Sequence, residues 1–311
     1  MLEIFLKTLP FFGLIGLGYG AGRSGFFNEE ATAYLTKFVF YFALSAMLFG
    51  FAANLSLADV FYWDFVWAYL AGCFAIYILA LAVAGLRRRP LDECAVEAQC
   101  AVIGNTGFLG VPMLVVLLGE AAAGPVLLVL ALDLIVFSSL IVAMITGGRG
   151  TGGIGAILAQ IFVGLLKNPM IMAMAAGLAV SALSVPVPQP VNEFLSILGA
   201  AATPGALFAI GASLAGKTAE RLSVAGWLTL CKLILHPAAV AAAALLIFEV
   251  RPFDAAVMIA AASLPVAGNV YMLAQHYGTA PQRVSAAILV STAFSIVTVS
   301  AVIAWVLPLT V

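Results

Sequence analysis

Two long apolar stretches of this chain are interrupted by the same kinds of residue, and these interruptions decide the fold. The first reads GNTGFLGVP over residues 104–112, and the second reads SLPVAGN over residues 263–269. Glycine and proline weaken or end helices, so each stretch predicts a helix that breaks midway. Lipid offers no hydrogen-bond partner to a freed backbone group, so such a break survives only inside protein or beside a watery cavity. Paired breaks in two halves of a chain are typical of a transporter's binding site.

The composition predicts a protein that lives in a lipid bilayer. Apolar residues make up 64% of the 311 residues and charged residues only 9%, whereas soluble domains carry about 25% charged residues. The net charge is −1 and no basic block is present, so we expect no nucleic-acid partner. The four cysteines form no CxxC pair or Cys/His cluster, so we interpret them as reduced, packed thiols and expect no metal.

The apolar segments predict an all-α polytopic membrane protein with ten transmembrane helices, because each span needs roughly 20 apolar residues. The apolar run before the sixth span begins at Ile154, too early for one helix. We interpret residues 154–166 as a helix at the membrane interface, ended by Lys167 and Asn168, with Pro169 starting the span. The predicted limits are 4–22, 32–53, 63–85, 95–119, 123–146, 168–185, 194–214, 222–248, 254–277 and 284–308.

The positions of lysine and arginine predict the orientation, because cytoplasmic loops carry an excess of both. Only Lys7 and Arg251 lie near span ends on the opposite face. We therefore expect a cytoplasmic (inner) membrane protein with both termini on the outer, periplasmic side. The loops after the odd-numbered spans hold Arg23, Arg87, Arg88, Arg89, Arg149, Lys167, Lys217, Arg221 and Arg283.

The two halves of the chain resemble each other at a shift of 159 residues. At this shift Pro10 meets Pro169, and further matches include Gly18 with Gly177, Leu48-Phe49 with Leu207-Phe208, and Gly119 with Gly278. An odd number of spans per half forces the second half to insert upside down. The chain is therefore predicted to be a 5+5 inverted repeat, with residues 1–146 and 168–311 as the repeats and residues 147–167 as a short cytoplasmic linker. Its alternative is a ten-helix bundle with accidental internal resemblance.

An inverted repeat would bring the two broken spans, the fourth and the ninth, together to cross near the middle of the membrane. Each break exposes a half-helix N-terminus, whose free N–H groups and partial positive charge suit an anion. Asparagine amides beside the breaks can both donate and accept hydrogen bonds. The predicted substrate-binding residues are Asn105, Thr106, Gly107, Pro112, Pro265, Gly268 and Asn269.

Several motifs resemble those of the auxin efflux carrier family, which includes bacterial malonate-transporter-like proteins. The resemblance covers nearly the whole chain and keeps the order of the motifs. The motifs are NTGFLGVP at residues 105–112, KNP at 167–169, TPGALF at 203–208 through Leu214, His236-Pro237, and residues 264–269. Members often have a proline where this chain has Ser45, and the long cytoplasmic insertion of the plant proteins is absent, since the linker here is Gly147 to Gly155.

The resemblance implies a carrier related in fold to bile-acid symporters and sodium/proton antiporters. Such carriers have a scaffold of spans 1, 2, 6 and 7 and a mobile, elevator-like transport domain of spans 3–5 and 8–10. Family members move small organic anions, often carboxylates, and the scaffold commonly forms a homodimer. By the same resemblance, Asn105 and the region of Pro265 would line the substrate site.

Ionisable residues inside membrane spans are costly and usually functional. Asp133 lies near the middle of the fifth span, and Lys232 and His236 are four residues apart in the eighth, so they share a helix face. These three are candidates for ion coupling by H⁺ or Na⁺, and structural pairing is the alternative for each. Glu97, near the cytoplasmic end of the fourth span, is interpreted as facing water.

The function that these features favour is secondary active transport of a small organic anion, with no tightly bound cofactor. No G-x-x-x-x-G-K-[ST] loop is present, so we expect no direct drive by ATP. An intramembrane enzyme is disfavoured because clustered aspartates and the HExxH pattern are both missing from the sequence. A passive channel or a receptor remains the alternative, because broken helices also occur in channels.

Overall fold

Helices build almost all of the regular structure in the computed structural model, which describes residues 2–55, 61–149, 153–216 and 222–310. Lys217 and Arg221, two of the residues used to predict the orientation, lie outside these ranges. The α-helices are α1 (Leu2–Arg23), α2 (Glu29–Phe38), α3 (Leu44–Ala53), α5 (Trp63–Leu86), α6 (Leu91–Val102), α7 (Val111–Leu118), α8 (Ala123–Leu132), α9 (Ser138–Gly148), α10 (Ile154–Leu166), α11 (Pro169–Ala182), α12 (Gln189–Ala200), α13 (Ala202–Ala215), α14 (Leu222–Leu230), α15 (His236–Ala242), α16 (Pro252–Ala262), α17 (Gly268–His276) and α18 (Pro281–Val306). The π-helical turns are η1 (Val39–Ala43), η2 (Thr106–Gly110), η4 (Asp133–Phe137), η5 (Cys231–Leu235) and η6 (Ala243–Ile247), and the 3₁₀ turns are η3 (Glu120–Ala122) and η7 (Leu307–Thr310).

Seven helices among the described residues are long and apolar enough to cross a membrane. They are Ile4–Arg23, Glu29–Ala53, Trp63–Leu86, Glu120–Gly148, Gln189–Ala215, Leu222–Ile247 and Pro281–Leu309. An eighth candidate is the pair α10 and α11, which are bent by 70° relative to each other. The predicted fourth and ninth spans are interrupted, so none of their segments reaches this length. The chain is therefore all-helical and polytopic, whereas the count of ten spans stays a prediction.

The two sequence breaks lie against each other in the structure. Residues 103–105 separate α6 from η2, and residues 263–267 separate α16 from α17. An isolated antiparallel β-bridge pairs Gly104 with Val266. The backbone N–H of Asn105 donates to the carbonyl of Pro265 at 2.8 Å, and a second bond of 3.1 Å runs from the second break to the first. Each break therefore gives the backbone of the other break the hydrogen-bond partners that lipid cannot provide.

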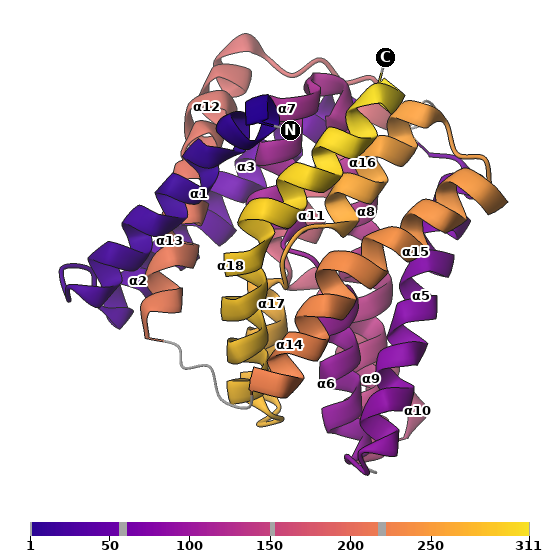
Figure 1. Ribbon diagram of the computed structural model, residues 1–311. Coiled ribbons are helices and arrows are strands. Elements are labelled where there is room, and N and C mark those ends of the chain that lie inside the picture. The colour runs from indigo at the N-terminus through magenta and orange to yellow at the C-terminus, as the bar shows by residue number, and fades with distance from the viewer. Residues whose placement is uncertain (1, 56–60, 150–152, 217–221, 311) are drawn as a thin grey trace.

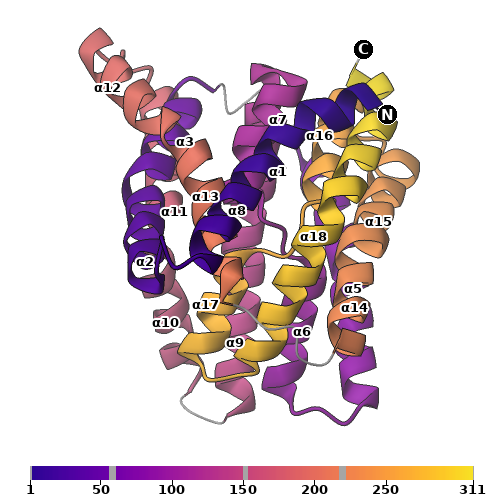
Figure 2. The ribbon, with the colours of Figure 1, turned by 60° about the vertical axis from the view of Figure 1, so that its left-hand side comes forward.

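The helices pack as two groups that lie on either side of the molecule. In one group, α1 packs along α13, and α3 packs against α11 and α12. In the other group, α5 packs against α6 and α15, α14 against α18, and α8 against α16. Figures 1 and 2 show α2, α3, α12 and α13 gathered on one side, away from α5 and α15. They also show that α1 begins and α18 ends at the same end of the molecule.

Positions that match at the shift of 159 residues make equivalent contacts. A methyl group built on Gly18 of α1 would lie 2.1 Å from the carbonyl oxygen of Phe208, and one built on Gly177 of α11 would lie 2.7 Å from that of Phe49. Gly18 matches Gly177, and Phe49 matches Phe208. Both contacts therefore join one half of the chain to the other through the same pair of positions. The inverted repeat stays a prediction that these contacts support.

A charged cluster joins the ends of α5, α6 and α18. Arg283 donates through Nη1 to Glu93 at 3.0 Å and to Glu97 at 2.7 Å, and Arg87 forms a further ion pair with Glu97. Only 1% of Glu97 is exposed, so the interpretation that it faces water is wrong. Its partner Arg283 lies 186 residues away in the sequence, and a buried carboxylate is stable only with such pairing.

A further ion pair ties α6 to the end of α9. Arg149 donates to Asp92 at 3.0 Å and to both the backbone oxygen of Tyr277 and the hydroxyl of Thr279 at 2.7 Å. Partial burial raises the pKa of Asp92, but the hydrogen bonds from Arg149 and the Glu93 backbone outweigh it and hold that pKa below its usual value. The start of α6, the end of α9 and the segment after α17 are thereby fastened to one another.

Adding a methyl group at Gly18 tests the tight contact between α1 and α13. The Gly18→Ala substitution forces the new methyl group against backbone, which cannot rotate away, so we expect a loss of roughly 1–3 kcal/mol or more in stability. Gly20→Ala in the same helix is the matched control, because a methyl group there meets nothing within 4 Å. Thermal unfolding of the purified variants in detergent checks this. Equal melting temperatures for both variants would contradict the observed packing.

Candidate functional site

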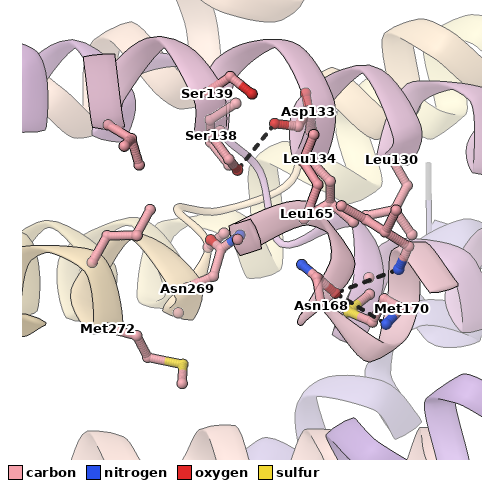
Figure 3. Close-up of a pocket in the computed structure, with 18 of the residues that line it drawn as sticks. Leu130, Asp133, Leu134, Ser138, Ser139, Leu165, Asn168, Met170, Asn269 and Met272 are labelled. Atoms are coloured by element: carbon pink, nitrogen blue, oxygen red, sulfur yellow. Dashed lines mark hydrogen bonds between the residues drawn. The ribbon is translucent and has the colours of Figure 1, made fainter. Parts of the chain in front are cut away.

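A cavity of about 240 Å³ lies beside the paired breaks. It is lined by residues of the first break and η2, by η4 and α9, by α10 and the start of α11, and by the start of α17. Figure 3 shows Asp133 and Ser138 on one side of it, with Asn168 and Asn269 opposite. Most of the remaining lining is apolar, including Leu130, Leu134, Val142, Ile161, Leu165 and Ile171. The cavity therefore offers a few polar groups on an otherwise apolar wall, which is typical of small-molecule sites.

Three asparagine side chains line this cavity, and each keeps hydrogen-bonding capacity to spare. Only 7% of Asn105 is exposed, and no described residue forms a hydrogen bond with its side-chain amide. Asn269 has a buried Oδ1 atom without a partner among the described residues. Asn168 uses its Oδ1 atom to cap α11. Buried polar groups are normally paired, so unpaired amides in a cavity indicate a ligand or water.

The cavity is also the point where helices begin. The turn η2 starts at Thr106, α11 starts at Pro169 and α17 starts at Gly268, and each start lies at or next to a lining residue. Among the described lining residues none is a lysine or an arginine, and the charged one is Asp133. An anion in this cavity would therefore be held by helix N-termini and neutral amides instead of by a cationic side chain.

Asp133 connects the cavity to the first break. Its side chain is 3% exposed; Oδ1 accepts a hydrogen bond from the Tyr69 hydroxyl at 2.7 Å, and Oδ2 accepts one from the Thr106 hydroxyl at 3.3 Å. Tyr69 belongs to α5, so the carboxyl group joins the third predicted span to the broken fourth. A change in the protonation of Asp133 would alter both hydrogen bonds, one of them to the break itself.

Lys232 and His236 form a second buried cluster behind the breaks, and the His236 ring lies edge-on to that of Tyr69, the donor to Asp133. The Lys232 Nζ atom lies 3.1 Å from His236 Nδ1, and both atoms contact the carbonyl oxygen of Ala262. Ala262 ends α16, so its carbonyl has lost its helical partner and this cluster replaces it. The other ring nitrogen of His236 lies 3.1 Å from the Cys73 sulfur. Neither Lys232 nor His236 is among the described residues that line the cavity.

The other predicted substrate-binding residues divide into two sets. Gly107 and Gly268 line the cavity together with Asn105 and Asn269. Thr106, Pro112 and Pro265 are outside the described lining of the cavity. Thr106 instead bonds to Asp133, Pro265 accepts the hydrogen bond that joins the two breaks, and Pro112 lies buried in the first turn of α7. These three residues support the site in the structure without lining it.

A second cavity, of about 180 Å³, also lies beside the paired breaks. Asn105, Phe108, Gly268 and Asn269 line both cavities. The second cavity adds hydroxyl groups from α2, α13 and α18, among them Thr292. The paired breaks therefore border two spaces, and only the first has a carboxyl group among the described residues that line it.

Sequence reasoning missed Asn168 and Gln160 as lining residues. Asn168 was recognised only as the end of the interfacial helix, although an asparagine before a proline is a typical helix cap. Gln160 bonds through Nε2 to the Tyr277 hydroxyl at 2.9 Å, which no local pattern could have indicated. Among the described residues, no group of three or more His, Cys, Asp or Glu side chains could hold a metal ion.

Comparison with known proteins identifies the family. A family model described as "Membrane transport protein" matches residues 3–152 and 153–303, which is nearly all of the chain. The chain belongs to this family. It is the auxin efflux carrier-like family that the sequence motifs indicated, so that resemblance is confirmed. The protein is thus a multi-pass membrane transport protein and not an enzyme, as the sequence predicted.

Two relatives place the chain within this family. A protein of Rhizobium meliloti (strain 1021) named "Putative malonate transporter" is 32% identical over 306 residues, which are 96% of this chain and 95% of that protein. The "Lysosomal cholesterol signaling protein" of Mus musculus is 27% identical over 246 residues. Those residues are 75% of this chain but 28% of the mouse protein, so this chain matches a part of that larger molecule.

The hydrogen bond from Tyr69 to Asp133 is testable with a matched pair of substitutions in α5. The Tyr69→Phe substitution leaves a buried carboxyl group without one of its donors, so we expect a loss of about 1–3 kcal/mol in stability. Tyr77→Phe removes a hydroxyl whose hydrogen-bond partner among the described residues is the Met144 sulfur, at 3.5 Å, and should cost less. Thermal unfolding in detergent compares the two. A larger loss for Tyr77→Phe would contradict the assigned role of Tyr69.

Proposed function

We propose that this chain is a secondary active transporter of a small organic anion, a mono- or dicarboxylate, in the cytoplasmic membrane. The observation that carries the proposal is the cavity at the paired breaks. There Asn105, a residue only 7% exposed, lies beside helix N-termini, and its side-chain amide has no hydrogen-bond partner among the described residues. Backbone N–H groups and amides at helix starts bind carboxylates without a cationic side chain. The membrane transport family supports the same class of function.

The transport mechanism that fits this arrangement is elevator-like alternating access. The group built on α1, α3, α11, α12 and α13 corresponds to the proposed scaffold, and the group built on α5, α6, α14, α15 and α16 to the proposed transport domain. Both breaks would move with the second group, carrying the substrate past α11 and α13. The scaffold would form a homodimer, and the arginine-rich loops held together by the charged cluster would face the cytoplasm.

Asp133 is the group that we assign to ion coupling. Its carboxyl group lines the cavity and bonds to the first break, so binding of H⁺ or Na⁺ there would alter the substrate site directly. Lys232 and His236 would contribute to coupling indirectly, because they bond to the end of the half-helix α16 next to the second break. The name of the bacterial relative makes malonate the first substrate to test.

A sensor without transport is the second candidate, and the name of the mouse relative favours it. A sensor and a transporter with the same cavity would both bind a carboxylate. Only a transporter would accumulate it in a closed vesicle against its own concentration gradient. A passive channel would equilibrate the anion without accumulating it.

Uptake into proteoliposomes tests the proposed site. Purified protein should accumulate radiolabelled malonate or another small carboxylate when a proton or Na⁺ gradient is imposed, and Asn105→Ala should abolish this uptake because it removes the buried amide. Asn192→Ala is the matched control, since that exposed amide bonds to the Val187 carbonyl far from the cavity. Normal uptake by a folded Asn105→Ala variant would remove this residue from the site.

The coupling role of Asp133 is testable by separating exchange from accumulation. The Asp133→Asn substitution keeps the size of the side chain but cannot take up or release a proton. We expect it to retain exchange of labelled for unlabelled substrate and to lose gradient-driven accumulation. Asp64→Asn, at an exposed position in the first turn of α5, should retain both activities. Gradient-driven accumulation by Asp133→Asn at the wild-type level would refute coupling through this residue.

A further inference from the structure

Asn168 occupies the bend between α10 and α11, on the opposite side of the cavity from Asp133 (Figure 3). Its Oδ1 atom accepts hydrogen bonds from the backbone N–H groups of Met170 at 3.0 Å and Ile171 at 3.4 Å. Those N–H groups belong to the first turn of α11 and have no acceptor within the helix. Asn168 is therefore the N-cap of α11.

The cap fixes the direction of the amide. An N–H group requires an oxygen as acceptor, so the carbonyl oxygen of the Asn168 side chain must face α11 and the NH₂ group must point away from it. Figure 3 shows this nitrogen directed into the space toward Asn269. Among the described residues, none accepts a hydrogen bond from it. A pair of donors is thus held in place at the cavity with no partner among the described residues.

The electrostatics of the cavity make such donors important. None of its described lining residues is a lysine or an arginine, and the carboxyl group of Asp133 repels an anion when it is ionised. Affinity for a carboxylate then depends on the number of neutral donors that can reach it. Asn105 and Asn269 supply donors from the two breaks, and Asn168 is the asparagine that supplies them from the α10–α11 side.

We propose that Asn168 is a third substrate-binding residue, whose NH₂ group donates to the carboxylate while its oxygen caps α11. This inference rests on the proposed function of the cavity. Asn168 caps α11, which packs against α3 in the proposed scaffold, whereas the two breaks belong to the proposed transport domain. The substrate would therefore bridge the two helix groups in this conformation. Movement of the breaks past α11 would break that contact, so Asn168 sets the affinity on one side of the transport cycle.

Substitutions that preserve the cap separate the binding role from the structural one. Serine and aspartate both cap helices well, so Asn168→Ser and Asn168→Asp keep an acceptor for the N–H groups of α11. Both remove the NH₂ donors, and aspartate adds a negative charge next to the anion. A purely structural role predicts that aspartate is at least as good as asparagine, because a carboxylate at a helix N-terminus is favourable.

The measurement is equilibrium binding of radiolabelled malonate and radiolabelled benzoate to the purified full-length protein in detergent. For each probe that the wild type binds, we expect Asn168→Ser to weaken binding about 10-fold or more and Asn168→Asp to weaken it further. Both variants should unfold within a few degrees of the wild type. Asn28→Asp is the matched control: Asn28 caps α2 by accepting from the Ala31 N–H at 2.8 Å, is absent from the described lining of the cavity, and should leave binding unchanged.

Each outcome decides the matter. Wild-type affinity in folded Asn168→Ser and Asn168→Asp, together with loss of binding in Asn105→Ala, would overturn the role of Asn168 and leave the proposed function intact. Equal losses in Asn168→Asp and Asn28→Asp would also overturn it, because the effect would then not depend on the position of Asn168 at the cavity. Failure of the wild-type protein to bind or transport any carboxylate would overturn the proposed function and this inference with it.

Discussion

The pairing of the two breaks is the constraint on which the site depends. A helix that breaks within the membrane frees backbone N–H and C=O groups that lipid cannot bond. Here the N–H of Asn105 bonds to Pro265, the N–H of Ala267 bonds to Ile103, and the N–H of Val266 bonds to the Ser291 hydroxyl. Because the backbone groups find partners in one another, the amide side chains of the breaks are not needed for this purpose. Their unused donors and acceptors are what makes the cavity the binding site that we propose.

Features with local signals could be predicted from the sequence, and those that depend on distant partners could not. Glycine and proline mark the two breaks. Lys167, Asn168 and Pro169 mark the boundary between the helix at residues 154–166 and the next one, and the structure places that boundary at the same residues. Glu97 had no such signal. When almost every helix of a chain is apolar, the sequence pattern does not reveal which polar side chains face each other. Glu97 and Arg283 are 186 residues apart, and the packing of the helices brings them together.

The candidate site shows the same division. Asn105 and Asn269 were predicted because they belong to the breaks, and both line the cavity. Asp133 was named from its residue type as a candidate for ion coupling. Its hydrogen-bond partners Tyr69 and Thr106 come from two other predicted spans and were not foreseen. The other two candidates for ion coupling, Lys232 and His236, bond to the end of α16, another contact that the sequence did not foresee. A residue's chemistry is readable from its type, whereas its partners follow from helix packing.

The two halves are alike in backbone contacts but differ in charge, and this difference matters for transport. At the shift of 159 residues, Asp133 matches Thr292 and Lys232 matches Cys73. Asp133 lines the first cavity and Thr292 lines the second, so matched positions of the two halves place a carboxyl group in one space beside the breaks and a hydroxyl in the other. In the inverted repeat that we propose, equivalent backbones allow inward and outward states of similar energy. Unequal charges then let an ion gradient favour one of those states, because a ligand shifts an equilibrium only through its different affinity for the two states.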